Sequence, residues 1–483
     1  MAETETPRAR DGDREVQGRS RFGLPDIYVI LFVFIALAAI STHFLPASQY
    51  DRVVLENGRT SIDAASFRYV EADPVGLVEF MTAIPRGLVD ASVVVFFTFI
   101  IGGMFMVIRR TGLIEVAVDK LTRRFAERSV LVLPVLMTTF AVIATLIGTQ
   151  ELSLVYVPVI LPLMIALGFD SMVAVGVALC ATTVGFTAGV LNPINTGLAQ
   201  TIAGVPLWSG IWLRVLLLVC LLVTAAAYVM RYAGRVRADP GASLMAGDPD
   251  EARKRRDYRG EMGGSARTFS PRQIAAGLAA LGFFAVLVWG VLAQGWFMTE
   301  MSGLFIVMGI TVGLIAGLTT RQICDGFNAG FREVLVGAMI VGIARAVAVM
   351  FEDAQVMDTL TNGLGQTVGG FPESVAAVGM FLAQMGFNFV IPSGSGQALV
   401  TMPVMAPLAD LVGVTRQTAI LAYQMGDGFS NILFPTSGYF MATLALAGVS
   451  WSRWVKFFLP LFAIWAAIGI AFMILAQLVQ WTG

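Results

Sequence analysis

The chain has 483 residues, of which 57% are hydrophobic and only 13% are charged. Because soluble globular proteins carry about 25% charged residues, this composition excludes a large water-exposed surface and predicts an integral membrane protein. The net charge of −1 gives no indication of a nucleic-acid partner. The single histidine, His43, argues against a histidine-based metal centre or catalytic triad.

Apolar segments long enough to cross a bilayer recur along the chain, and we expect about nine crossings of roughly 20 residues each. They lie at 27–45, 88–108, 171–205, 211–230, 274–294, 303–319, 331–351, 415–449 and 454–480. The first follows a polar, arginine-rich tail, residues 1–25. A signal peptide is the alternative interpretation there, but the length of the run favours an uncleaved helix.

Two further apolar stretches, 129–167 and 375–411, have polar residues at their midpoints and resemble each other. GTQELSLVYVPVILPLMIALG in the first returns as SGSGQALVTMPVMAPLADLVG in the second. Pro158, Pro162 and Gly168 fall on Pro403, Pro407 and Gly413 at one constant offset. Each stretch is either two crossings or one re-entrant helical hairpin. The short, uncharged or acidic midpoints favour hairpins, because irregular backbone at membrane depth is tolerated only against protein or a water-filled cavity.

Each repeated stretch is followed by an apolar segment that is broken near its far end. The break in 171–205 is Asn192-Pro193-Ile194-Asn195-Thr196-Gly197, and the break in 415–449 is Phe434-Pro435-Thr436-Ser437-Gly438. We therefore predict an all-α polytopic membrane protein with inverted repeats, two opposed re-entrant hairpins and discontinuous helices, the plan of a secondary transporter.

The distribution of Lys and Arg predicts the orientation. The tail 1–25 and the basic loop 234–270 are expected in the cytoplasm, and the acidic loop 46–87 is expected outside, which also places the C-terminus outside. The two membrane halves are then 26–233 and 271–483. The first hairpin opens to the cytoplasm and the second to the outside, so the repeats are inverted, with a site at their interface.

The two hairpin tips and two helix breaks should converge on that site. Broken helices present backbone carbonyl and N–H groups to a ligand, and Ser, Thr and Asn add neutral oxygens that suit Na⁺. The candidates for binding are Thr149, Gln150, Glu151, Asn192, Asn195, Thr196, Ser393, Ser395, Gln397, Asn431, Thr436 and Ser437. The alternative is that these polar side chains only satisfy the broken backbone.

Ionisable residues within apolar segments are stronger indications of function, because burying charge in a bilayer costs several kcal/mol. Glu151 lies at the first tip and Asp427 lies deep in a crossing, where either could bind a proton, a sodium ion or a cationic substrate group. The alternative for both is a buried ion pair with Arg345. Arg345 could instead bind a substrate carboxylate with its planar fork, or extend to the membrane interface.

At these residues the chain resembles a known family. The run NFVIPSGSGQALVTMPVMAPLADLVGVTRQTAILAYQMGDGFSNILFPTSG, with FLPASQYDR, IGGMFMVIRRTG, NPINTGLAQ and YVMRYAGRVRADP, is similar to the YfcC family. That family belongs to the Dcu-type (four-carbon dicarboxylate anaerobic carrier) group of the ion transporter superfamily. The resemblance covers most of the chain.

The resemblance implies a multi-pass carrier of the bacterial inner membrane, with a scaffold domain, a transport domain, elevator-type movement and a homodimer. It also implies sodium between each tip and the neighbouring break, which here gives Thr149 with Asn195 and Ser395 with Thr436. Family members exchange arginine for ornithine or carry dicarboxylates. In the family the first tip commonly has two adjacent acids, whereas this chain has Gln150-Glu151, which weakens the transfer of a basic substrate.

The sequence therefore predicts a secondary active transporter for a small amino acid or an organic acid, with a weak preference for a basic amino acid and a four-carbon dicarboxylate as the alternative. Coupling to Na⁺ or H⁺ is expected, and no other cofactor. The expected partners are membrane lipid, the small-molecule substrate and a second copy of the chain. An ion channel is a remote alternative. An enzyme is not expected, because HExxH, GxSxG and Walker motifs are absent from the sequence.

Overall fold

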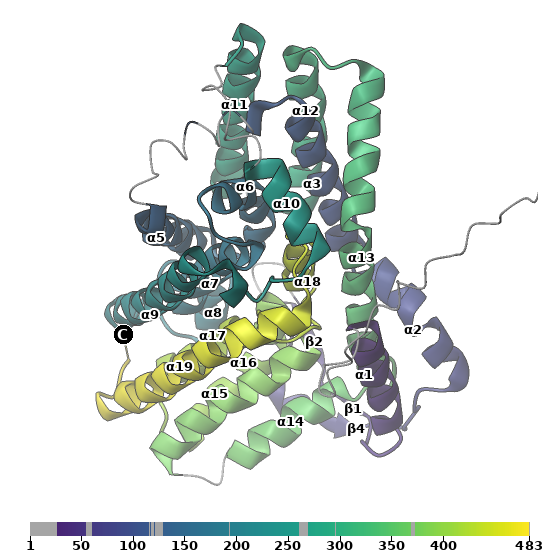
Figure 1. Cartoon of the computed structure of the whole chain (residues 1–483). Coiled ribbons are helices and arrows are strands. Elements are labelled where there is room, and N and C mark those ends of the chain that lie inside the picture. The colour runs from purple at the N-terminus through teal and green to yellow at the C-terminus, as the bar shows by residue number, and fades with distance from the viewer. Residues whose placement is uncertain are drawn as a thin grey trace, which may run out of the picture.

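A computed structural model describes residues 27–54, 60–114, 116, 120, 129–192, 194–259, 269–294, 296–368 and 372–482. In this part of the chain the fold is almost entirely helical (Figure 1). The helices are α1 Ile27–Ser41, α2 Leu77–Asp90, α3 Ser92–Arg110, α5 Ser129–Ile147, α6 Ser153–Ala166, α7 Ser171–Ala188, α8 Thr196–Ala203, α9 Ile211–Ala238, α10 Pro249–Arg259, α11 Pro271–Gln294, α12 Met298–Ala316, α13 Thr320–Asp353, α14 Met357–Val368, α15 Glu373–Val390, α16 Gly394–Leu411, α17 Arg416–Ser430, α18 Gly438–Leu446 and α19 Trp451–Leu478. The predicted tail 1–25 lies outside the described residues.

One group of helices, here called the wall helices, consists of α1, α2, α3, α11, α12 and α13. α13 packs along α1, α2 and α3, and α12 packs on α3 and α11. Close backbone approach at glycines holds α3 against α13: a Cβ built on Gly330 would lie 2.2 Å from the carbonyl oxygen of Gly102. Small residues at such contacts let helices associate in a membrane, where apolar surface alone gives no driving force.

The second group, here called the core helices, consists of α5–α9 and α15–α19. In Figure 1 α9, α15 and α19 run at a slant to α13, whereas α18 stands beside α13 and packs along it. Within the core helices, α5 and α6 both pack against α7, and α15 and α16 both pack against α17. The second arm of each pair also contacts the short helix that follows the other pair, since α6 packs on α18 and α16 packs on α8. α7 and α17 contact each other between the two pairs.

The predicted breaks are present at the expected positions. Gly148, with φ +80°, follows the end of α5, and α6 begins at Ser153. Residues 391–393 separate α15 from α16. The second helix of each pair, α6 or α16, has its two prolines inside the helix. α7 ends at Ala188 and is followed by Gly189, with φ +57°, before α8 begins at Thr196. Seven residues separate the end of α17 at Ser430 from the start of α18 at Gly438.

Among the described residues, seven helices are long and apolar enough to cross a membrane, or eight if the two parts of α13, bent by 42°, form one span. They include α3, α7, α9, α12 and α19, which were predicted as crossings, and α5 and α15, which were predicted as hairpin arms. The chain is thus an integral membrane protein.

The predicted loops contain more structure than a topology argument indicates. Within 46–87 lie two antiparallel strand pairs, β1 (Ser48–Gln49) with β4 (Arg68–Tyr69) and β2 (Arg52–Val54) with β3 (Thr60–Ile62), and most of α2. The basic loop 234–270 contains the last turn of α9 and the whole of α10. The predicted crossing 331–351 is part of the longer helix α13.

Candidate functional site

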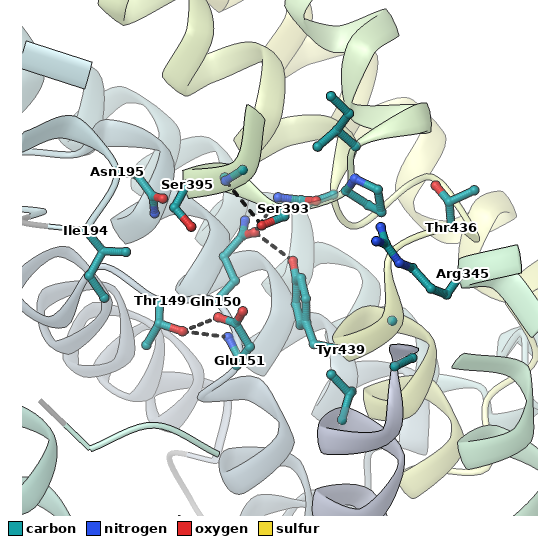
Figure 2. A pocket seen from close by; sticks show the side chains of 18 of the residues that line it. Thr149, Gln150, Glu151, Ile194, Asn195, Arg345, Ser393, Ser395, Thr436 and Tyr439 are labelled. Atoms are coloured by element: carbon teal, nitrogen blue, oxygen red, sulfur yellow. Dashed lines mark hydrogen bonds between the residues drawn. The ribbon is translucent and has the colours of Figure 1, made fainter. Parts of the chain in front are cut away.

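A cavity of about 680 Å³ lies where the two tips and two breaks meet (Figure 2). Residues of the turn before α6, of the turn between α15 and α16, and of both helix breaks line one side of it. Wall helices α2, α3 and α13 line the other side through Asp90, Val94, Val341 and Arg345. The described structure therefore places at one cavity the four elements that the repeated sequence marks.

Gln150 connects the first tip to the second half of the chain. Its side chain is 1% exposed. The amide nitrogen donates to the hydroxyl of Thr183 at 3.1 Å and to the carbonyl of Gly428 at 3.2 Å. The amide oxygen accepts from Asn431 at 3.0 Å and from the hydroxyl of Tyr439 at 2.7 Å. Because both ends of the amide are used, a carboxylate at this position could not replace it.

The first break is organised by two asparagines. The side-chain oxygen of Asn192 accepts from the backbone N–H groups of Ile194 and Asn195, at 3.1 and 2.9 Å. Asn195 in turn donates to the carbonyl of Gly148 at 3.2 Å, which ties the break to the first tip. Asn192 thus supports the backbone, whereas Asn195 reaches the cavity.

The second tip approaches Asn195 through a glycine. A Cβ built on Gly394, the first residue of α16, would lie 2.8 Å from Oδ1 of Asn195 and 2.9 Å from Oδ2 of Asp427. The hydroxyl of Ser393 caps α16 by accepting from the N–H of Gly396. The positive end of the α16 dipole therefore points toward the cavity wall and toward the buried carboxylate.

Asp427 is fully buried behind the second tip. Its Oδ1 accepts from Asn431 at 3.0 Å, and its Oδ2 has no hydrogen-bond partner among the described residues. Asn388, which donates to the backbone carbonyl of Asp427 at 3.1 Å, and Asn431 each have a side-chain oxygen that also lacks a partner in that part of the chain. An unpaired buried acceptor is costly, and a group of them suits a cation or a proton donor.

Two kinds of charge line the cavity. At the rim, Arg345 pairs with Asp90 and with Glu352 (Nη2 to Oε1, 2.8 Å), and Arg52 pairs with Asp358 at 3.1 Å. Glu151 lies inside the cavity, accepts from the hydroxyl of Thr149, and takes part in no ion pair among the described residues.

The alternative that Glu151 or Asp427 forms an ion pair with Arg345 was wrong, because Arg345 pairs instead with Asp90, the last residue of α2, and with Glu352 in the last turn of α13. Four carboxylates and two guanidinium groups line the cavity, an excess of two negative charges.

The structure separates the predicted site residues into two sets. Those that line the cavity are Thr149, Gln150, Glu151, Asn195, Ser393, Ser395, Asn431, Thr436 and Arg345. Those buried behind it are Asn192, Thr196, Gln397, Asp427 and Ser437. In the second set, Thr196 donates to Gln424 at 3.2 Å and Gln397 donates to Gln384 at 2.7 Å, so both of these are engaged with neighbouring helices.

Tyr439 and Asp90 line the cavity and were not predicted from the sequence. Tyr439 directly follows the second break, so its position there was the available signal. Asp90 ends α2 within a predicted crossing that in fact begins at Ser92. In the described part of the chain, no three His, Cys, Asp or Glu side chains gather as a metal site. The Na⁺ positions predicted at Thr149, Asn195, Ser395 and Thr436 would use neutral oxygens with backbone carbonyls.

The sequence matches a family model over residues 24–478. That model describes the DcuC family of C4-dicarboxylate anaerobic carriers. The chain belongs to the DcuC family. The match covers the wall helices, both tips and both breaks, so the cavity is part of a carrier-family fold and the chain is a membrane transporter rather than an enzyme.

Two curated relatives match the DcuC-family chain along nearly all of its length. YfcC of Escherichia coli, provisionally named a basic amino acid antiporter, is 32% identical, covering 90% of this chain and 93% of the relative. An uncharacterised protein of Haemophilus influenzae is 27% identical, covering 93% of this chain and 96% of the relative. The resemblance to the YfcC family is therefore confirmed.

Two solved transporter structures were also matched. MtrF of Neisseria gonorrhoeae is 17% identical, with a TM-score of 0.41, and covers 93% of this chain and 95% of its own. YdaH of Alcanivorax borkumensis is 15% identical, with a TM-score of 0.42, and covers 95% of this chain and 99% of its own. Structural likeness at this level supports no inference about the DcuC-family chain.

Proposed function

We propose that this DcuC-family protein is a secondary active transporter that exchanges or symports a small cationic amino acid, with arginine and ornithine as the first candidates. The observation that carries the proposal is the excess of negative charge in the cavity between the tips. Glu151 lies in the cavity without a guanidinium partner, whereas Arg345 and Arg52 are already paired with acids at the rim.

The charge of the cavity distinguishes the two substrates suggested by the relatives. A dicarboxylate would bring two negative charges toward Glu151, and like charges at close range in a partly buried site are costly. A basic amino acid would place its side-chain cation near Glu151 and its carboxylate near the N-terminal end of α16, where the helix dipole favours an anion once a proton or Na⁺ neutralises the neighbouring Asp427. The name of the Escherichia coli relative supports the same substrate class. A four-carbon dicarboxylate is the second candidate, supported by the description of the family.

Asp427 is proposed as the coupling group. Its buried Oδ2 lacks a hydrogen-bond donor among the described residues and lies beside the N-terminal end of α16. A proton on this oxygen, or Na⁺ held between it and the neutral side-chain oxygen of Asn195, would remove the cost of the buried charge. The gradient of that ion would then be linked to the conformation of the second tip.

Alternating access is proposed to follow from the exchanged contacts of α6 with α18 and of α16 with α8. These contacts support an inverted pair that surrounds one site, with the core helices moving as an elevator along the wall helices. The homodimer and the inner-membrane location with a cytoplasmic N-terminus belong to the same proposal.

The proposal is tested with purified protein in proteoliposomes. Uptake of labelled L-arginine against internal L-ornithine is compared with uptake of succinate against internal succinate, with and without Na⁺ and a pH gradient. Arginine uptake that responds to ornithine or to an ion gradient supports the proposal. Succinate uptake alone would overturn the cationic substrate. Uptake that ignores Na⁺, pH and counter-substrate alike would overturn the secondary carrier.

A further inference from the structure

The segment that follows α9 contains α10 and is bound firmly to the core helices. It belongs to the basic loop 234–270. Glu251 of α10 is 2% exposed, and its carboxylate accepts from the backbone N–H of Ser171 at 3.2 Å and from the Ser171 hydroxyl. Lys254, one turn later, donates to the carbonyl of Ala447 at the end of α18. One face of α10 thus caps the first turn of α7 and the last turn of α18.

Two more contacts fix the residues that lead into α10. Ser243 donates to Asp170, a fully buried carboxylate, at 2.6 Å. Asp248 pairs with Arg453 in the first turn of α19. Although burial acts to raise it, the hydrogen bond from Arg453 lowers the pKa of Asp248 below its ordinary value. α10 is therefore expected to move with the core helices.

The opposite side of α10 contacts the wall helices through weaker ion pairs. Asp257 pairs with Arg109 of α3 at 2.8 Å, and Arg253 lies 4.0 Å from Glu333 of α13. These four side chains are 29–55% exposed, whereas Glu251 on the core side is almost completely covered. Exposed ion pairs of this kind are weak. We therefore expect the contacts of α10 with the wall helices to separate before its contacts with the core helices.

A second cavity, of about 480 Å³, lies between α10 and the wall helices. Its lining includes Arg109 from α3, Glu333 from α13, and Ala445 and Leu446 from α18. The other end of α18, at Gly438, lines the cavity between the tips. α18 thus runs from one cavity to the other, and α10 borders the second cavity on the side where Asp257 and Arg253 reach the wall helices.

We propose that α10 is a gate on the predicted cytoplasmic side: it is carried by the core helices, and its ion pairs to Arg109 and Glu333 hold it over the second cavity. When these pairs separate, the cavity beside the end of α18 opens and becomes the exit path for the substrate. This inference rests on the proposed function, because a gate requires a transported substrate.

The test measures access to the second cavity without reference to any substrate. A reporter cysteine is introduced by Ala445→Cys in the full-length protein, with the exposed native Cys324 changed by Cys324→Ser. The reporter is labelled with a membrane-impermeant maleimide. Asp257→Arg should raise the labelling rate about threefold to fivefold, the change that corresponds to loss of one exposed ion pair. Combining it with Arg109→Asp, which restores an opposite-charge pair in the reversed sense, should return the rate to that of the reporter protein.

Asp325→Arg is the matched control. Asp325 is an exposed acid of α13 that does not line the second cavity and forms no ion pair among the described residues. This variant should leave labelling unchanged. Labelling that does not respond to Asp257→Arg, or that stays raised in the double variant, would overturn the gate even if arginine is transported. A labelling rate that returns to that of the reporter protein in the double variant supports the gate. If arginine uptake fails in the same preparation, that result counts only against the proposed function.

Discussion

The two tips share one sequence pattern, but different hydrogen bonds hold them in place. The first tip is braced: Gln150 hydrogen-bonds to α7, α17 and α18, and Asn195 holds the carbonyl of Gly148. The second tip is rich in glycine and serine, and Ser393 at its apex is exposed. Gly394 lies against Asp427 and Asn195 without a side chain of its own, and its backbone carbonyl accepts from the hydroxyl of Tyr423 of α17 at 2.7 Å. From this comparison we expect a fixed first tip, which carries the carboxylate Glu151 and is held by a buried side chain that reaches three helices, and a movable second tip, which lies over the buried Asp427 and is held at its start through a backbone carbonyl.

The acid behind the second tip gives the largest expected effect. Asp427→Asn is nearly isosteric and should lower arginine uptake by about 100-fold or more, because it removes the buried partner of a cation, a loss of about 3–5 kcal/mol. Thermal stability should be kept, since an uncompensated buried charge is removed. Uptake by proteoliposomes and a melting curve of the purified protein measure the two effects.

Thr182 occupies the position in the first copy that corresponds to Asp427, and it is equally buried. Its hydroxyl donates to backbone carbonyls within α7, those of Ala178 at 2.9 Å and Leu179 at 3.2 Å. Thr182→Val is therefore the matched control and should keep most of the uptake. Equal losses in the two variants would show that the copies do not differ in function at this level.

The carboxylate of the first tip gives the next largest effect. Glu151→Gln should weaken arginine binding by about 10- to 100-fold, the loss of one charge-assisted hydrogen bond of about 1.5–3 kcal/mol, as measured by isothermal titration. Glu352→Gln at the rim should have a smaller effect, because Glu352 already pairs with Arg345. Binding that improves for succinate in Glu151→Gln would support the charge argument, and unchanged binding of arginine would contradict it.

The close approach of the second tip gives a smaller effect. Gly394→Ala would place a methyl group within 3 Å of Asn195 and Asp427, and overpacking of about 1–3 kcal/mol should reduce uptake about tenfold. Gly386→Ala is the control, since nothing lies within 4 Å of its built Cβ on the exposed side of α15. That variant should retain uptake and melt at the same or a higher temperature. Full uptake by Gly394→Ala would show that the second tip does not close on Asp427.

Much of the fold around the two tips could be predicted from the sequence. The repeated prolines, the broken segments and the polar midpoints predicted the helix pairs and breaks, because these features are local properties of the backbone. The partners of Arg345 were not accessible, since Asp90 is 255 positions away in the chain and reaches it only through the packing of α2 on α13. The hydrogen bonds of α10 and the residues before it were not predicted for the same reason. The charge pattern predicts a basic loop, but it does not show which buried groups, such as Ser171 and Asp170, the side chains of that loop contact.

A substitution at Gln150, whose hydrogen bonds hold the first tip, is expected to have the smallest effect, but it best tests the difference between the two tips. The resemblance to the YfcC family led us to expect two adjacent acids at the first tip, and Gln150→Glu would create that pattern. The amide donates to Thr183 and Gly428, and a carboxylate cannot, so two buried acceptors would face a new negative charge beside Glu151. We expect destabilisation of about 1–3 kcal/mol, seen as a fall of a few degrees in melting temperature. Gln150→Glu with unchanged stability and tighter arginine binding would show instead that the first tip is as adaptable as the second, and the contrast between a fixed and a movable tip would be lost.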